Sequence, residues 1–145
     1  MKAFFASSTG WLRIASVLTL LLCLGHSIGC PWTPDHTPVG LAAAEQMKAF
    51  HIDAMGFERS YFDFYVGFGI TCSITNLALT LVLWQLGTLA KAHAAMLRPM
   101  IATLLVAFAG YAVIDCLYFF TAPIVLAIPT ALCLVPALAL AGRKA

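Results

Sequence analysis

Long apolar runs, each interrupted by only a few polar residues, dominate the chain from residue 11 onward. A helix that crosses a bilayer needs roughly 17 to 25 mostly apolar residues. The runs predict four such helices, at about 11–29, 60–86, 100–120 and 124–141. We therefore expect an all-α fold, an integral membrane four-helix bundle that forms a single transmembrane domain over residues 1–145.

The run at 60–86 is unusual because polar residues lie at its start and inside it. It opens beside Arg59 and contains Asp63 and Asn76. Lipid tolerates such groups only where protein or a water-filled cavity shields them. This run is therefore expected to be the central helix of the bundle.

A polar loop at 30–59 separates the first two predicted helices, and it is expected to contain a helix of its own. Thr37 followed by Pro38 is typical of an N-cap and a first helical position. The pattern predicts an amphipathic helix from Pro38 to about Ala54, ended by Gly56 and lying on the membrane surface. Its apolar face holds Leu41, Ala44, Met47 and Phe50 or His51.

A chain that crosses the membrane four times in this way carries unequal numbers of basic residues on its two sides. One side carries Lys2, Arg13, Lys91, Arg98, Arg143 and Lys144. The other side carries only Lys48 and Arg59. Because cytoplasmic segments of membrane proteins are enriched in Lys and Arg, we predict an N-in/C-in topology with the loop outside. The expected location is a cell membrane, the bacterial inner membrane, which the chain crosses several times.

Composition agrees with a membrane protein and argues against other classes. Hydrophobic residues make up 62% of the chain, charged residues 10%, and the mean hydropathy is +0.95. A soluble domain is nearer half apolar and a quarter charged. The net charge of +2 gives no reason to expect nucleic acid. The expected partners are the lipid bilayer, a hydrophobic small molecule, and a membrane-protein partner or a second copy of the chain.

The five cysteines contain no C-x-x-C pair, so neither a zinc module nor a redox motif is indicated. No metal and no cofactor are expected. A disulfide between Cys30 and Cys116 is left open, since both residues fall on the outer side of the threading. Residues 27–30 are weakly similar to a lipoprotein cleavage site, but Ser27 stands where a large aliphatic residue is usual. We expect the first helix to be retained.

Three titratable residues are the catalytic candidates: His26, Asp63 and Asp115. The four-helix arrangement brings all three to the outer third of the bundle. The functional interpretation is a polar pocket in which His26 and one Asp exchange protons while the other polar groups orient them. An acid at a bilayer centre costs about 2.5–3.5 kcal/mol, so its presence calls for a reason. The alternative is structural: Asp63 pairs with Arg59, His26 bonds to backbone, and Asp115 holds helices together.

Five further side chains are candidates for lining a ligand pocket. They are Arg59, Tyr65, Asn76, Tyr111 and Tyr118. Asn76 lies in a stripe of small and polar residues, which is more typical of close helix–helix contact than of a ligand site.

Two segments carry a resemblance to known proteins. A Gly-His-x-x-Gly motif occupies 25–29, and Arg-Ser-Tyr-Phe-Asp-Phe-Tyr-Val-Gly-Phe-Gly occupies 59–69. Together they resemble an uncharacterised family of small bacterial four-helix integral membrane proteins, over the whole chain. This resemblance implies the topology and supplies no reaction.

Two functions are consistent with these features. The first is a multi-pass membrane protein that binds a lipid-like or hydrophobic ligand or acts as an accessory subunit of a membrane complex. The second is a small membrane enzyme that uses the pocket of His26, Asp63 and Asp115. The sequence leaves open whether the protein is an enzyme.

Overall fold

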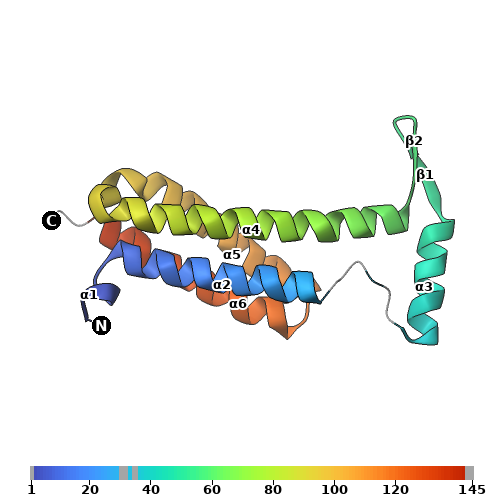
Figure 1. Cartoon of the computed structure of the whole chain (residues 1–145), viewed down its shortest axis with the longest axis horizontal. Helices are drawn as coiled ribbons and strands as arrows, with labels where there is room; N and C mark the ends of the chain where they lie inside the picture. The colour runs from blue at the N-terminus through green and yellow to red at the C-terminus, as the bar shows by residue number, and fades with distance from the viewer. Residues whose placement is uncertain (1, 30–32, 34–35, 143–145) are drawn as a thin grey trace. The chain divides into compact units, whose positions relative to one another are not determined.

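The computed structural model describes residues 2–29, 33 and 36–142. The chain is mostly helical (Figure 1). Its long helices are α2 (Ser8–Ile28), α4 (Tyr61–His93), α5 (Arg98–Tyr118) and α6 (Thr121–Ala141). The shorter elements are α1 (Lys2–Phe5), α3 (Pro38–Ala49), the strands β1 (His51–Ala54) and β2 (Phe57–Ser60), and the 3-10 helix η1 (Ala94–Leu97).

Within the described residues, three helical segments are long and apolar enough to cross a membrane: Ser8–Ile28, Tyr61–Tyr118 and Thr121–Ala141. The second is 58 residues long and contains α4, η1 and α5. The expected all-α architecture is confirmed in outline, and the β1–β2 hairpin is an addition that the apolar runs did not predict.

Helix α4 continues to His93, whereas the sequence predicted an end near Leu86. The prediction treated Gly87 as a helix terminator, as glycine often is. In the structure Gly87 is buried, and a Cβ atom placed on it would lie 3.3 Å from Nε of Arg13. Gly87 therefore serves close packing inside α4, and the helix does not end there.

The helix in the loop begins as predicted and ends earlier. Thr37 caps α3, since its hydroxyl accepts a hydrogen bond from the amide of Gly40 at 3.1 Å, and Pro38 occupies the first turn. The predicted extension to Ala54 is wrong, because α3 ends at Ala49 and a hairpin follows.

The hairpin pairs β1 and β2 antiparallel, with His51 opposite Ser60 and Ala54 opposite Phe57. Met55 and Gly56 connect the strands with φ angles of 58° and 88°. Two consecutive positive φ values are what a type I′ turn requires, and this turn matches the twist of paired strands. Gly56 is thus a hairpin residue, where the sequence predicted the end of a helix.

The structure divides into two compact units, which we describe separately: unit 1 is Met1–Leu22 with Asn76–Ala145, and unit 2 is Cys23–Thr75. The helices α2 and α4 each contribute to both units. The single transmembrane domain expected over residues 1–145 stays a prediction.

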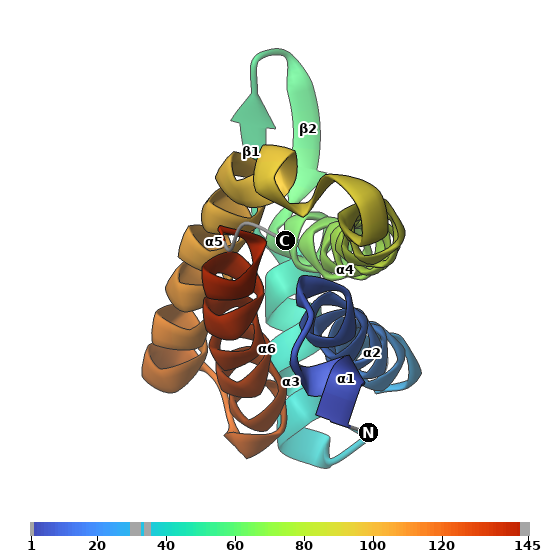
Figure 2. The same ribbon diagram turned by 90° about the vertical axis from the view of Figure 1, so that its left-hand side faces the viewer.

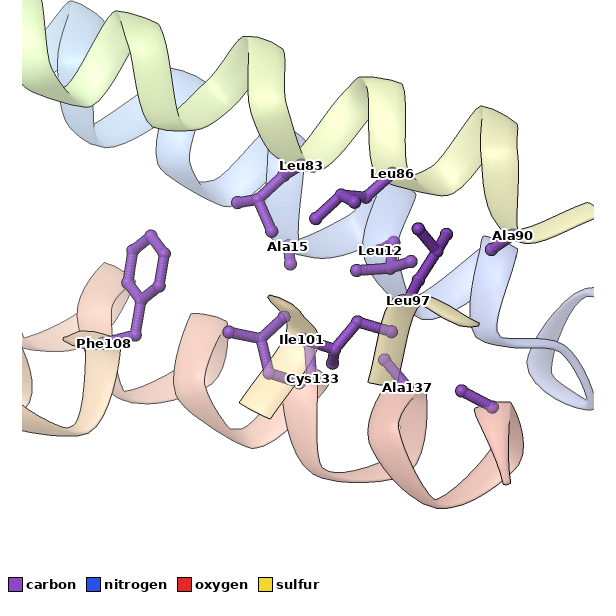
Figure 3. Close-up of a cluster of buried hydrophobic side chains, with 12 residues drawn as sticks. Leu12, Ala15, Leu83, Leu86, Ala90, Leu97, Ile101, Phe108, Cys133 and Ala137 are labelled. Atoms are coloured by element: carbon purple, nitrogen blue, oxygen red, sulfur yellow. The ribbon is translucent and has the colours of Figure 1, made fainter. Parts of the chain in front are cut away.

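Unit 1 is a helical bundle in which α5 and α6 lie side by side and η1 turns the chain from α4 into α5 (Figure 2). Its core contains the fully buried side chains of Leu12, Leu83, Ile101 and Phe108 (Figure 3), together with Leu134. Two further leucines and several small residues belong to the same cluster: Leu86, Leu97, Ala15, Ala90, Cys133, Ala137 and Ala141. Small residues let helix backbones approach closely, which is the usual way that helices associate within lipid.

Unit 2 contains the last turns of α2, then α3, the hairpin and the first part of α4. The rings of Phe50 and Tyr61 stack with their centroids 4.9 Å apart, and the amide of Tyr61 donates to the carbonyl of Phe50 at 3.1 Å. These contacts close the base of the hairpin, where α3 has just ended and α4 begins. The outward-facing salt bridge of α3 joins Lys48 and Glu45 at 2.9 Å.

Candidate functional site

Asp63, a catalytic candidate, forms part of the start of α4. Its Oδ2 accepts from the amide of Ser60 at 2.8 Å and from the hydroxyl of Ser60 at 2.9 Å. The amide of Asp63 donates back to Oγ of Ser60 at 3.1 Å. This is a capping box, which satisfies amides that a helix start leaves without helical partners. The geometry therefore gives Asp63 a local structural task.

Arg59 does not form the expected pair with Asp63. Its Nη1 donates to the carbonyl of Glu58 at 2.7 Å, and its guanidinium lies 5.8 Å from the ring of Phe57. Within the described residues, the side-chain salt bridge is the Lys48–Glu45 pair of α3. The one-turn spacing of Arg59 and Asp63 was misleading because Arg59 lies on β2, outside the helix.

His26 joins two helices within unit 2. Its Nε2 lies 2.9 Å from the carbonyl oxygen of Gly69. A carbonyl accepts only, so Nε2 carries the proton in this contact. The ring is partly buried, and the bond ties the last turns of α2 to α4.

Two neighbours of His26 make the same connection. Cys23 Sγ donates to the carbonyl of Ser73 at 3.4 Å, and the hydroxyl of Ser27 donates to that of Ser73 at 2.9 Å. The end of α2 in unit 2 is therefore held to α4 by a run of small polar side chains. Such contacts average about 0.6 kcal/mol each in membrane proteins, and they fix which faces of two helices meet.

Asp115, Tyr111 and Tyr118 belong to unit 1, whereas His26 and Asp63 belong to unit 2. The Asp115 side chain is half-buried on α5, and Tyr118 is exposed near the end of that helix. Tyr111 packs edge-on against Phe108, with ring centroids 5.8 Å apart. The shared pocket of His26, Asp63 and Asp115 stays a prediction.

The two remaining pocket candidates have different surroundings. Tyr65 is exposed on α4 and lies 6.1 Å from Phe62, between ring centroids. Asn76 is buried in unit 1, and its carbonyl accepts from the hydroxyl of Thr80 at 2.9 Å. Burial against a helix surface agrees with the interpretation of Asn76 as a packing residue.

Within residues 2–29, 33 and 36–142, no group of three or more His, Cys, Asp or Glu side chains is arranged to hold a metal ion. Cys116 is an exposed free cysteine and Cys30 lies outside the described residues, so the structure gives no support for the disulfide that the sequence left open between them.

Two shallow depressions lie on the surface of the described part of the chain. One, of about 400 Å³, lies on the hairpin and is lined by His51, Ile52, Asp53, Gly56 and Glu58. The other, of about 230 Å³, lies on unit 1 and is lined by Phe4, Arg13, Ile14, Val17 and Leu18. We call the second depression the Arg13 groove.

Arg13 is a residue whose surroundings the sequence did not predict. Its guanidinium lies 3.4 Å above the ring of Trp84, and Nη2 donates to the hydroxyl of Thr88 at 2.7 Å. The Nη1 atom is buried and has no hydrogen-bond partner among the described residues. The sequence indicated only a long cation near a membrane interface. The available signal was Gly87, the small residue of α4 over which the Arg13 side chain lies.

The hydrogen bonds that hydroxyl side chains of α2 make to other helices were also not predicted. In unit 1, Ser8 donates to the carbonyl of Ala137 at 2.9 Å, and Ser16 donates to the carbonyl of Thr80 at 2.8 Å. Ser16, Cys23 and Ser27 follow one another at spacings of seven and four residues, which places them on one helix face. That spacing was a usable signal for the face of α2 that contacts α4.

No family model, curated protein or solved structure matches this chain. The resemblance to small bacterial four-helix membrane proteins stays an expectation.

Proposed function

We propose that this chain is a multi-pass protein of a cell membrane, the bacterial inner membrane, with lipid in contact with its long helices. The observation that carries the proposal is the exposure of large apolar side chains along α2, α4, α5 and α6. Examples are Leu21, Leu81, Val106, Val125 and Leu132, each between 49% and 73% exposed. Exposing apolar surface to water costs roughly 25 cal/mol per Å² of free energy, whereas contact with lipid tails carries no such cost.

We further propose four crossings, with both termini in the cytoplasm. A 33-residue α4 is about 50 Å long at 1.5 Å per residue, and a hydrocarbon core is about 30 Å thick. The 58-residue Tyr61–Tyr118 segment has length for two crossings, with η1 as its turn. The concentration of Lys and Arg near α1, η1 and the chain end supports the cytoplasmic side for these parts.

The proposed role is non-enzymatic: binding of a lipid-like molecule, or support of a larger membrane complex. Two of the catalytic candidates already have structural tasks, since Asp63 caps α4 and His26 ties α2 to the carbonyl of Gly69. Side chains occupied in this way favour a packing role over proton transfer. The alternative of a membrane enzyme requires His26, Asp63 and Asp115 to form one pocket.

Cysteine labelling tests the topology at two exposed methionines, Met55 in the hairpin turn and Met96 in η1. In a background without native cysteines, Met55→Cys should react with a membrane-impermeant maleimide in intact spheroplasts. Met96→Cys should react only after lysis, because η1 is expected in the cytoplasm.

Both variants should stay in the membrane pellet after carbonate washing. Release by carbonate would contradict the membrane assignment. Labelling of both positions in intact cells would contradict the topology alone.

A further inference from the structure

We infer that the Arg13 groove binds the anionic headgroup of a bilayer phospholipid, with the phosphate at Arg13 and an acyl chain along the groove. This inference rests on the proposed membrane location and names the ligand and the site. Its starting point is the guanidinium of Arg13, which the surrounding protein satisfies only in part.

The contacts of Arg13 fix its position and leave hydrogen-bonding capacity unused. Trp84 covers one face of the guanidinium at 3.4 Å, and Thr88 accepts from Nη2. The absence of a Cβ atom at Gly87 leaves room for the side chain. Nη1 is buried without a partner among the described residues. A buried donor left unsatisfied is costly, and more so on a charged group, so a partner from outside the chain is favoured.

Charge complementarity identifies that partner as an anion. The described part of unit 1 contains four Lys or Arg residues, Lys2, Arg13, Lys91 and Arg98, and one acidic residue, Asp115. Asp115 lies 17 residues along α5 from Arg98, which is about 25 Å at 1.5 Å per residue. This carboxylate is too far along the helix to neutralise the basic end, which therefore needs anions from its surroundings.

The other lining residues identify the anion as part of a lipid. The groove that reaches Arg13 is otherwise lined by Phe4, Ile14, Val17 and Leu18, and its exposed surface is apolar. Val17 and Phe4 are 48% and 44% exposed. A phosphate ion would leave this apolar surface uncovered, whereas a phospholipid places a phosphate and a hydrocarbon chain on adjoining parts of one site.

Basic sites between helices on the cytoplasmic side are known to hold lipid headgroups. In the proposed topology the Arg13 groove lies at the cytoplasmic leaflet, where anionic lipids are available. An arginine presents a planar donor fork that suits phosphate.

Native mass spectrometry of the full chain in mild detergent tests this inference. The probes are dioleoyl phosphatidylglycerol and dioleoyl phosphatidylcholine, titrated separately. We expect the anionic lipid to bind about tenfold or more tightly, the ratio that one charged hydrogen bond provides. Equal affinity for the two lipids would overturn the inference, as would competition by millimolar inorganic phosphate, which would point to a site for the free ion.

Variants separate the groove from general charge attraction. Arg13→Gln should lose at least about tenfold in affinity for the anionic lipid, whereas Lys91→Gln, the matched control at the same end of the unit, should change it less than about threefold. Val17→Glu leaves every contact of Arg13 in place and adds a carboxylate one helical turn away, so it should abolish the preference for the anionic lipid.

Val17→Gln is the uncharged control for Val17→Glu and should retain the preference. Equal losses in Arg13→Gln and Lys91→Gln, or in the two Val17 variants, would overturn the inference. Carbonate washing of the same membranes keeps the two proposals apart. Release from the membrane rejects the membrane assignment, whereas retention without lipid preference rejects only the lipid site.

Discussion

At the scale of single residues, the structure assigns helix-holding roles to side chains that the sequence marked as possible chemistry. Asp63 and Ser60 exchange hydrogen bonds in both directions at the start of α4. The spacing of a serine followed three residues later by an acid is readable as a capping box. The structural alternative drawn from the sequence paired Asp63 with Arg59, because the sequence did not show that Arg59 belongs to a strand.

Replacing Ser60 tests this role at the cap. Ser60→Ala removes the hydroxyl that accepts from the amide of Asp63, while Ser60→Thr keeps one. We expect Ser60→Ala to lower the free energy of unfolding by about 0.5–2 kcal/mol, and Ser60→Thr to lower it by less. Circular dichroism during SDS titration from mild detergent micelles measures the change. Equal stability of Ser60→Ala and the unmodified chain would show that the cap is unimportant.

At the scale of elements, glycines explain both boundary errors in the sequence prediction. Gly56 was predicted to end the loop helix, and Gly87 was predicted to begin the loop after the helix at 60–86. Gly56 has a φ of 88° in a hairpin turn, and Gly87 lies buried in a helix against Arg13. The long helices were predictable from hydrophobicity because about 20 apolar residues are a strong signal. Four-residue strands give a weak signal, so the hairpin was missed.

The hairpin turn offers a prediction at this scale. Met55 has a φ of 58°, a conformation that costs most residues about 1–2 kcal/mol and that asparagine adopts more readily. Met55→Asn creates an Asn-Gly turn, the sequence preferred for type I′. We expect slower hydrogen–deuterium exchange of backbone amides in residues 51–60 of this variant. Met55→Leu is the matched control and should exchange at the original rate; faster exchange in Met55→Asn would contradict the turn assignment.

At the scale of the whole molecule, exposure means different things in different parts of the chain. Met55 is 99% exposed in the hairpin and Val106 is 73% exposed in the middle of α5. In water the two sites would tolerate a charge equally. Within a membrane only the hairpin site would tolerate a charge. The apolar runs of the sequence predict this difference, since Val106 lies inside one of them and Met55 does not. The helix contacts depend on side chains far apart in sequence, so hydrophobicity could not supply them.

Lysine at each site measures this difference. Val106→Lys should cost about 2.5–3.5 kcal/mol of insertion free energy, as expected for lysine at the centre of a transmembrane helix. Met55→Lys should leave insertion unchanged. The fraction of chain that is inserted, measured after synthesis in the presence of membranes, reports both. Equal insertion of the two variants would mean that α5 does not cross the bilayer.

The hydrogen bonds between helices affect which substitutions this sequence can tolerate during evolution. In three of them the donor is a side chain of α2, namely Ser16, Cys23 or His26, and the acceptor is a main-chain carbonyl of α4. Every residue type supplies a carbonyl, so the acceptor survives almost any substitution in α4. The residue types that these three bonds require are therefore on α2. At these bonds α4 contributes only its backbone, so substitutions at Gly69 and Thr80 preserve the acceptors as long as α4 stays helical.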